Sequence, residues 1–172
     1  TAYQLELSFI PLSTIGSIVS ESILIELAAV ISSLVLAGKV GARMATELGT
    51  MKVSEQVDAL ESMGFNSVSY LVVPRVLAGL LMFPVLYVAA SGGLVAGILT
   101  NAVPAAEYIK GAQSFFAPWN VLFGFVKSFV FGFVITSIAC YKGYYASGGA
   151  EGVGTATTQA TVLGCIYVLL AD

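Results

Sequence analysis

The chain has no histidine, and only two of its 172 residues are cysteines. A zinc site, a Ser-His hydrolase and a histidine proton relay are all hard to build without histidine. Cys140 and Cys165 lie in or beside apolar runs and lack the C-x-x-C spacing of metal or redox pairs, so we interpret them as small buried hydrophobic residues. We therefore expect neither a catalytic residue nor a metal site in this chain.

Charge is also scarce, because 10% of the residues are charged whereas 58% are hydrophobic, and the mean hydropathy is +0.93. A soluble domain of this size could not hide so much apolar surface. Apolar runs lie near residues 15–37, 76–99, 119–141 and 156–171, and about 20 apolar residues cross a bilayer as a helix. None of the runs alternates as a barrel strand does. We predict an all-α, polytopic membrane protein with about four transmembrane helices in a single domain, residues 1–172.

The ends of the chain look cut. Residue 1 is Thr rather than Met, and no signal peptide is visible in the opening segment. The last apolar run ends at Asp172, just short of a comfortable span. We expect that an N-terminal part is missing and that the last helix continues beyond this residue.

The segment from Leu36 to Arg75 interrupts two apolar runs with a dense polar insert. It holds four of the seven Lys and Arg residues and four of the ten acids. Val53, Val57 and Leu60 recur at helical spacing, which predicts a short amphipathic helix near residues 50–63 that ends at Gly64. Its polar face carries three acids and one Lys, and this balance favours a protein partner over lipid headgroups.

The distribution of basic residues predicts the orientation of the chain. The loop between the first two runs carries Lys39, Arg43, Lys52 and Arg75, whereas residues 100–118 carry only Lys110. The positive-inside rule therefore places residues 39–66 and 142–154 in the cytoplasm, and residues 100–118 and both chain ends on the opposite side.

The string AGKVGARMATELGTMKVSEQVDALESMG, followed by LVVPRVLAG, resembles the signature of the MlaE permease family. The likeness is strong over residues 36–79 and looser elsewhere, where ELAAV, the pair Lys127-Ser128 and GVGTATTQATV agree with it. Many relatives have Arg-Glu-Leu-Gly where this chain has Ile25-Glu26-Leu27-Ala28, so an Arg-dependent lipid contact is not expected here. The family pattern also has an amphipathic helix and a membrane helix ahead of residue 1.

The resemblance implies a permease subunit, itself not an enzyme, of an ABC transporter in the bacterial cytoplasmic (inner) membrane. Such transporters move phospholipid or related lipid between that membrane and a periplasmic MCE-domain lipid-binding protein. The implied partners are a second copy of the chain, a cytoplasmic ABC ATPase subunit that binds ATP and Mg, the MCE protein and the lipid. No cofactor in this chain and no nucleic acid are implied.

Two groups of residues follow as candidates for the site. We expect an ATPase-coupling insert over about residues 46–66, with contacts from Glu47, Thr50, Met51, Glu55, Gln56, Asp58, Leu60 and Met63. Intramembrane charges are expensive and mark functional positions by default. We therefore expect a lipid cavity near Phe9, Glu26 and Lys127.

Two patterns have structural interpretations. Small residues recur every four positions at Ala29, Ser33, Ala37, Gly41 and Ala45, and we expect them to pack within the chain rather than along a dimer seam. The run from Gly148 to Thr155 lacks the Lys of a phosphate-binding loop, so we expect a flexible cytoplasmic turn there.

Other classes of function stay open from the sequence. A secondary transporter or channel could use Glu26 and Lys127 as an ion path without ATP, although no internal repeat and no row of charges along a span supports it. A membrane anchor that recruits a cytoplasmic partner through the polar insert is a third reading. Co-purification of a nucleotide-binding subunit distinguishes the first reading from these two.

Overall fold

The computed structural model describes residues 13–92, 105–114 and 117–172. Nearly all of these residues are helical, and no strand occurs among them. Four helical segments in this part of the chain are long and apolar enough to cross a membrane: Ser17–Val53, Val68–Ser91, Pro118–Tyr144 and Gly149–Ala171. The predicted all-α class and the four predicted spans are confirmed.

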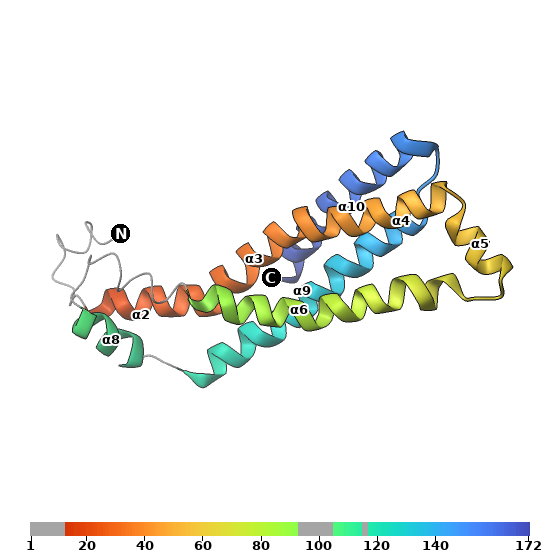
Figure 1. The fold of residues 1–172 in the computed structure, drawn as a ribbon. Helices are drawn as coiled ribbons and strands as arrows, with labels where there is room; N and C mark the ends of the chain where they lie inside the picture. The colour runs from red at the N-terminus through yellow and green to blue at the C-terminus, as the bar shows by residue number, and fades with distance from the viewer. Residues whose placement is uncertain (1–12, 93–104, 115–116) are drawn as a thin grey trace. The chain divides into compact units, whose positions relative to one another are not determined.

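One unbroken helical segment, residues 13–53, contains the first span; α-helices, labelled in Figure 1, alternate in it with π-helical turns, which we name η. Its parts are α2 (Ser13–Ser22), η1 (Ile23–Leu27), α3 (Ala28–Leu36), η2 (Ala37–Gly41) and α4 (Ala42–Val53). The span has 37 residues, whereas about 20 are enough to cross the apolar core of a bilayer as a helix. The prediction of a loop beginning near Lys39 is therefore wrong. No Pro interrupts residues 42–53, and α4 packs along α10, so the helix continues past the apolar run.

The next elements are α5 (Gln56–Ser62), η3 (Val68–Val72) and α6 (Val73–Ser91). The predicted single helix over 50–63 is wrong, because the chain bends at Ser54 and Glu55 and divides it between α4 and α5. Its predicted end is confirmed, since Gly64 adopts the left-handed φ of 84° that glycine tolerates. In η3 the N–H of Val73 donates to the carbonyl of Val68, five residues back, and Pro74, which has no N–H of its own, follows directly.

The last elements are α8 (Ala105–Ser114), α9 (Pro118–Tyr144) and α10 (Gly149–Ala171). Helix α8 lies within residues 100–118, where only a loop was expected. The expected flexible turn over 148–155 is wrong too, because α10 begins at Gly149 and the turn is confined to the few residues before it. Val153 is buried, and the hydroxyl of Thr155 donates to the carbonyl of Glu151, so this glycine-rich run is held as helix.

Contacts along the backbone group the chain into two units, which we describe separately. The α2–α8 unit comprises residues up to Ser32 together with Val85–Lys127, and the α4–α10 unit comprises Ser33–Pro84 together with Ser128–Asp172. In the first unit α2 packs against α8, and in the second α4 and η2 pack against α10 (Figure 1). Cys140 in α9 is a fully buried free thiol, as predicted for a small hydrophobic residue, and Cys165 in α10 is half-buried and free.

The α4–α10 unit is held together by close approach of helices at small residues. A Cβ atom placed on Gly143 of α9 would lie 2.7 Å from the carbonyl oxygen of Ala45 and 2.9 Å from Cβ of Leu48. One turn farther along α4, a Cβ on Gly49 would lie 3.2 Å from Cβ of Ala146. The five residues of the small-residue stripe, Ala29 to Ala45, are all buried, which confirms the expected packing within the chain.

We expect Gly143→Ala to lower the stability of the protein by about 1–3 kcal/mol, because the added methyl group meets the backbone of α4, which cannot rotate away. Gly154→Ala is the matched control. Nothing lies within 4 Å of a Cβ at that position of α10, so helix propensity should make the change neutral or stabilising by up to about 1 kcal/mol. Thermal unfolding of the two variants in the same detergent checks this, and equal midpoints would contradict the packing described.

Candidate functional site

The bend between α4 and α5 lies at one end of the α4–α10 unit. The N–H of Ser54 donates to the carbonyl of Thr50 at 3.0 Å, and the Ser54 hydroxyl donates to the same carbonyl at 2.7 Å. Glu55 then takes a left-handed φ of 61°, which is uncommon and costly for a residue other than glycine. Backbone strain of this kind collects at functional sites, where the surrounding structure enforces it.

An ion pair holds α5 in its bent position against α4. Lys52 Nζ lies 2.6 Å from Asp58 Oδ1. On a straight α-helix two residues six positions apart would point about 120° away from each other, so this pair forms only because the chain bends between them. Val57, on the inner side of α5, is fully buried. One buried apolar side chain and one ion pair therefore accompany the bend.

A second polar cluster joins the end of α5 to the end of α9. The hydroxyl of Ser67 donates to Oε1 of Glu61 at 2.5 Å, and the hydroxyl of Tyr144 lies 3.1 Å from the same oxygen and 2.7 Å from Ser67 Oγ. Both hydrogen bonds lower the pKa of Glu61, and the bond from Ser67 has the larger effect. The carboxylate is therefore ionised at neutral pH, and α5 is tied to α9 by a charged acceptor. We call Glu61, Ser67 and Tyr144 the α5–α9 anchor.

Glu47 connects α4 to α6. Its Oε1 accepts from Arg43 Nε at 2.8 Å, and its Oε2 lies 3.5 Å from Arg75 Nη2. Exposed pairs of this kind contribute about 0–1 kcal/mol each, so the cluster orients side chains more than it stabilises the fold. Both carboxylate oxygens of Glu47 have partners within the chain.

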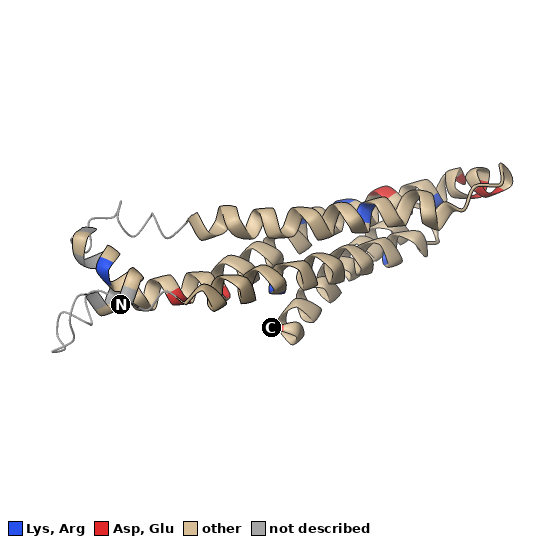
Figure 2. Cartoon of the chain, turned by 90° about the horizontal axis from the view of Figure 1, so that it is seen from below, with Lys and Arg blue, Asp and Glu red and all other residues tan. Residues whose placement is uncertain are grey.

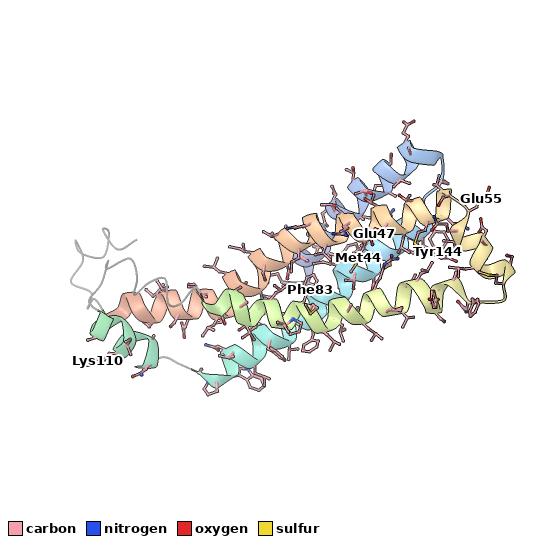
Figure 3. All side chains as sticks on the ribbon, viewed as in Figure 1. Met44, Glu47, Glu55, Phe83, Lys110 and Tyr144 are labelled. Carbon is pink, nitrogen blue, oxygen red and sulfur yellow. The ribbon has the colours of Figure 1, made fainter. Side chains whose placement is uncertain are left out.

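The structure places most of the predicted coupling residues on the outer side of the bend. Glu55 projects outward from the bend, while Tyr144 lies behind it (Figure 3). The acidic residues of α5 gather at this same end of the unit (Figure 2). Six of the eight are exposed and two are half-buried; the exposed ones are Glu47, Thr50, Glu55, Gln56, Asp58 and Met63, and the half-buried ones are Met51 and Leu60. That these residues contact an ATPase stays a prediction.

Sequence reasoning missed the α5–α9 anchor. Glu61 is one of the three acids on the polar face of the predicted helix, and no sequence pattern marks Ser67 or Tyr144 as a site residue. Ser67 and Tyr144 are 77 positions apart, and Tyr144 follows the third apolar run as an ordinary interfacial tyrosine would. No spacing in the sequence signals such a contact, because it depends on where two separate helices end.

The lipid-cavity candidates Glu26 and Lys127 meet in the α2–α8 unit. Lys127 Nζ lies 3.2 Å from Glu26 Oε2 and 5.8 Å from the centre of the Phe123 ring. The lysine is buried, with 7% of its surface exposed, while 52% of the glutamate side chain is exposed in the single chain. Glu26 lies in η1, and π-helical turns occur often at functional sites. Phe9, the third candidate, lies outside the described residues.

The Glu26–Lys127 pair shows how charged residues can lie in an apolar span. An isolated charge in hydrocarbon is expensive, and pairing with an opposite charge reduces the cost. Since the lysine is enclosed and the glutamate is not, the carboxylate is the member of the pair that another group can approach. Elsewhere in the part of the chain that the structure describes, no group of three or more Cys, Asp or Glu side chains is arranged to hold a metal ion.

Several known proteins are similar to this chain over most of its length. A probable ABC transporter permease protein of Rickettsia bellii is 40% identical over 165 residues, which cover 93% of this chain and 64% of that protein. A probable ABC transporter permease protein of Synechocystis is also 40% identical over 165 residues, with coverage of 93% and 63%. The chloroplastic protein TRIGALACTOSYLDIACYLGLYCEROL 1 of Arabidopsis thaliana is 37% identical over 164 residues, with coverage of 92% and 47%.

The chain thus spans a little under two thirds of the bacterial relatives' length. The family described as Permease MlaE matches residues 1–172, so the match includes the four spans, the α4–α5 bend and the Glu26–Lys127 pair. This multi-pass membrane protein belongs to the MlaE permease family.

Proposed function

We propose that this chain is the membrane subunit of an ABC transporter that moves phospholipid or a related lipid. In this proposal it works as a homodimer in the bacterial inner membrane, with a cytoplasmic ATPase subunit that binds ATP and Mg and with a periplasmic MCE-domain lipid carrier. The chain itself hydrolyses nothing and holds no cofactor. Its task is to convert movement of the ATPase into opening and closing of a cavity for lipid.

The observation that carries the proposal is the α4–α5 bend. A short helix with an exposed acidic face stands at the end of a long helix, and it is tied to α4 by Lys52–Asp58 and to α9 by the α5–α9 anchor. A force applied to α5 would therefore reach two spans at once. An inert membrane anchor has no need of such connections.

Lipid as the cargo has two supports. The Arabidopsis relative carries the name of a lipid, trigalactosyldiacylglycerol. Within this chain, the half-exposed carboxylate of Glu26 is a polar group in a largely apolar part of the first span, and a headgroup can approach it. An ion path without ATP is less well supported, because Glu26 and Lys127 neutralise each other as a pair.

Coupling is tested by reversing charge on α5 while the bend is kept. Glu55→Lys should weaken binding of the ATPase by about tenfold, which corresponds to about 1.4 kcal/mol, because it changes the sign of an exposed side chain at the centre of the proposed contact. Co-purification of the ATPase and lipid transport per ATP hydrolysed are the measurements. Glu55→Gly is the matched control for the backbone, since glycine takes the left-handed φ without strain.

A second pair of variants separates contact from local structure. Asp58→Lys alone loses the Lys52 pair, whereas Asp58→Lys combined with Lys52→Asp restores an ion pair with opposite polarity. We expect both to impair coupling, because the outer face is altered in both. Normal assembly and normal transport in Glu55→Lys and in the exchanged pair would show that the ATPase binds elsewhere.

The proposal also requires that the bend lie in the cytoplasm. With Cys140 and Cys165 replaced, a cysteine at Ser54 should react with an impermeant reagent only after lysis of spheroplasts. A cysteine at Ala112 in α8 should react in intact spheroplasts, because residues 100–118 are expected on the opposite side of the membrane. The reverse pattern of labelling would remove α5 from any cytoplasmic ATPase.

The Glu26–Lys127 pair is tested by neutralising both members. Lys127→Ala should destabilise the protein, because it leaves a carboxylate without its partner; the cost should be smaller than the about 3–5 kcal/mol of a fully buried pair, since Glu26 is half-exposed. Glu26→Gln combined with Lys127→Gln removes both charges and should recover much of that stability. If the pair serves lipid binding, this stable double variant should still transport lipid several-fold more slowly than the natural chain.

Thermal unfolding and lipid transport by the assembled complex are the two measurements for these variants. A double variant that is both stable and fully active would show that the pair has a structural role alone.

A further inference from the structure

Two cavities lie side by side on the surface formed by α9 and α10 in the α4–α10 unit. The first, of about 520 Å³, is polar and is lined by the turn between the helices and by Lys142, Ser147, Glu151, Thr155 and Gln159, among others. The second, of about 530 Å³, is apolar, and its walls include Phe133, Val134, Ile138, Leu163 and Tyr167. Tyr141 and Lys142 line both, so the two cavities meet, and we call them together the α9–α10 furrow.

The length of the furrow matches one leaflet of a bilayer. Its walls on α10 run from Glu151 to Tyr167, which is about 24 Å along a helix at 1.5 Å per residue. A bilayer with its headgroups is about 40–45 Å thick, so that one leaflet is about 20–22 Å. Each half of the furrow also falls in the range of about 300–1,000 Å³ that is usual for small-molecule sites.

The polar and apolar parts of the furrow follow each other in the same order as the headgroup and acyl chains of a phospholipid. The polar half is at the ends of the two spans, where headgroups lie, and the apolar half runs toward the middle of the membrane. Lys142 Nζ donates to Gln159 Oε1 at 3.0 Å, which holds the ammonium group at the junction of the halves. Glu151 places a carboxylate farther out in the polar half. A phosphate beside Lys142 and an ammonium group beside Glu151 would satisfy both charges.

The rim of the furrow also suits a lipid. It carries exposed tyrosines, with 61% of Tyr141, 68% of Tyr145 and 50% of Tyr167 accessible. Tyrosine is favoured where a ring meets acyl chains and its hydroxyl meets headgroups.

We propose that the α9–α10 furrow binds one zwitterionic phospholipid from the leaflet on the side of the α9–α10 turn, with its headgroup between Lys142 and Glu151 and an acyl chain along Leu163. This site lies in the α4–α10 unit and does not involve the Glu26–Lys127 pair. It goes beyond the proposed function, because it requires only that the chain be in a bilayer and not that the bound lipid be transported.

The test uses the purified complex in nanodiscs that contain phosphatidylethanolamine and phosphatidylglycerol, with a trace of either lipid carrying a photoactivatable group in its acyl chain. After irradiation without ATP, mass spectrometry locates the labelled peptides. We expect label on residues 133–138 and 163–167. Leu163→Trp should reduce it by about tenfold, since filling a packed site commonly costs on the order of 1–3 kcal/mol.

Val162→Trp is the matched control, because the neighbouring residue is half-exposed on α10 but does not line the furrow. It should leave the labelling unchanged, and thermal unfolding of both Trp variants checks that each is folded. Glu151→Gln should bring the ratio of phosphatidylethanolamine to phosphatidylglycerol labelling close to one, because it removes the partner of the ammonium group. Lys39→Gln, which removes another exposed charge outside the furrow, should leave that ratio unchanged.

Three results would overturn the proposal: no label on these segments, equal labelling of Leu163→Trp and Val162→Trp, or disulfide bonding between two copies of Leu163→Cys, which would show that a second copy covers the furrow. Failure of the proposed function gives a different result. If the furrow is labelled but the complex moves no lipid, this inference stands and the transport proposal falls; if lipid moves without labelling, the reverse holds.

Discussion

Close approach of helices at small residues is the constraint on which the rest of this structure depends. Lipid tails are as apolar as leucine, so membrane helices gain little from the hydrophobic effect when they associate and must rely on packing. Gly143 brings α9 against the backbone of α4, and Gly49 receives Ala146 and Val153. Hydrogen bonding adds a polar contact along the same helix, because the hydroxyls of Thr46 and Thr157 lie 2.8 Å apart. Helix α4 is thus packed against both α9 and α10. This packing fixes the position of the bend at its end.

The polar groups of the α4–α10 unit act where that packing ends. The Lys52–Asp58 pair and the α5–α9 anchor lie at the end of the unit that contains the α4–α5 bend. Water can reach them there, and each bond alone contributes little stability. Their value is geometric, because together they connect α5 to two helices that the small residues already hold in place. The strained φ of Glu55 fits this arrangement, since a left-handed residue persists when both flanking segments are fixed. We infer that two parts of the unit have different tasks. The small residues supply the stability of the helix packing, and the polar contacts at the end of the unit fix the position of α5.

Features that depend on composition or on local chemistry could be predicted from the sequence, and features that depend on where helices meet could not. The four spans follow from hydropathy alone, and the helix end at Gly64 follows from the freedom of glycine to take a positive φ. Glu26 and Lys127 could be singled out as costly intramembrane charges, although nothing in the sequence showed that they pair with each other, 101 positions apart. The bend at Ser54 was missed because the contact that accompanies it, between Lys52 and Asp58, forms only once the chain has bent. The start of α10 was missed because a glycine-rich run usually signals a turn, whereas burial of Val153 against its neighbours overrides that preference.

The spacing of four residues in the small-residue stripe also bears on the geometry of the helix that carries it. Residues four apart on an α-helix advance by about 40° beyond a full turn, so a stripe of interval four spirals around a regular helix and after four steps faces nearly the opposite side. Ala29 and Ala45, four steps apart, are nevertheless both fully buried. The π-helical turn η2 at Ala37–Gly41 lies between them and inserts an extra residue, which takes back about 100° of that drift. In the α4–α10 unit the stripe also meets two helices, because a Cβ on Gly164 of α10 would lie 3.5 Å from Ala37 and a Cβ on Gly41 would lie 3.4 Å from Ile135 of α9. Burial at an interval of four therefore reflects both the π-helical turn and the presence of two partner helices.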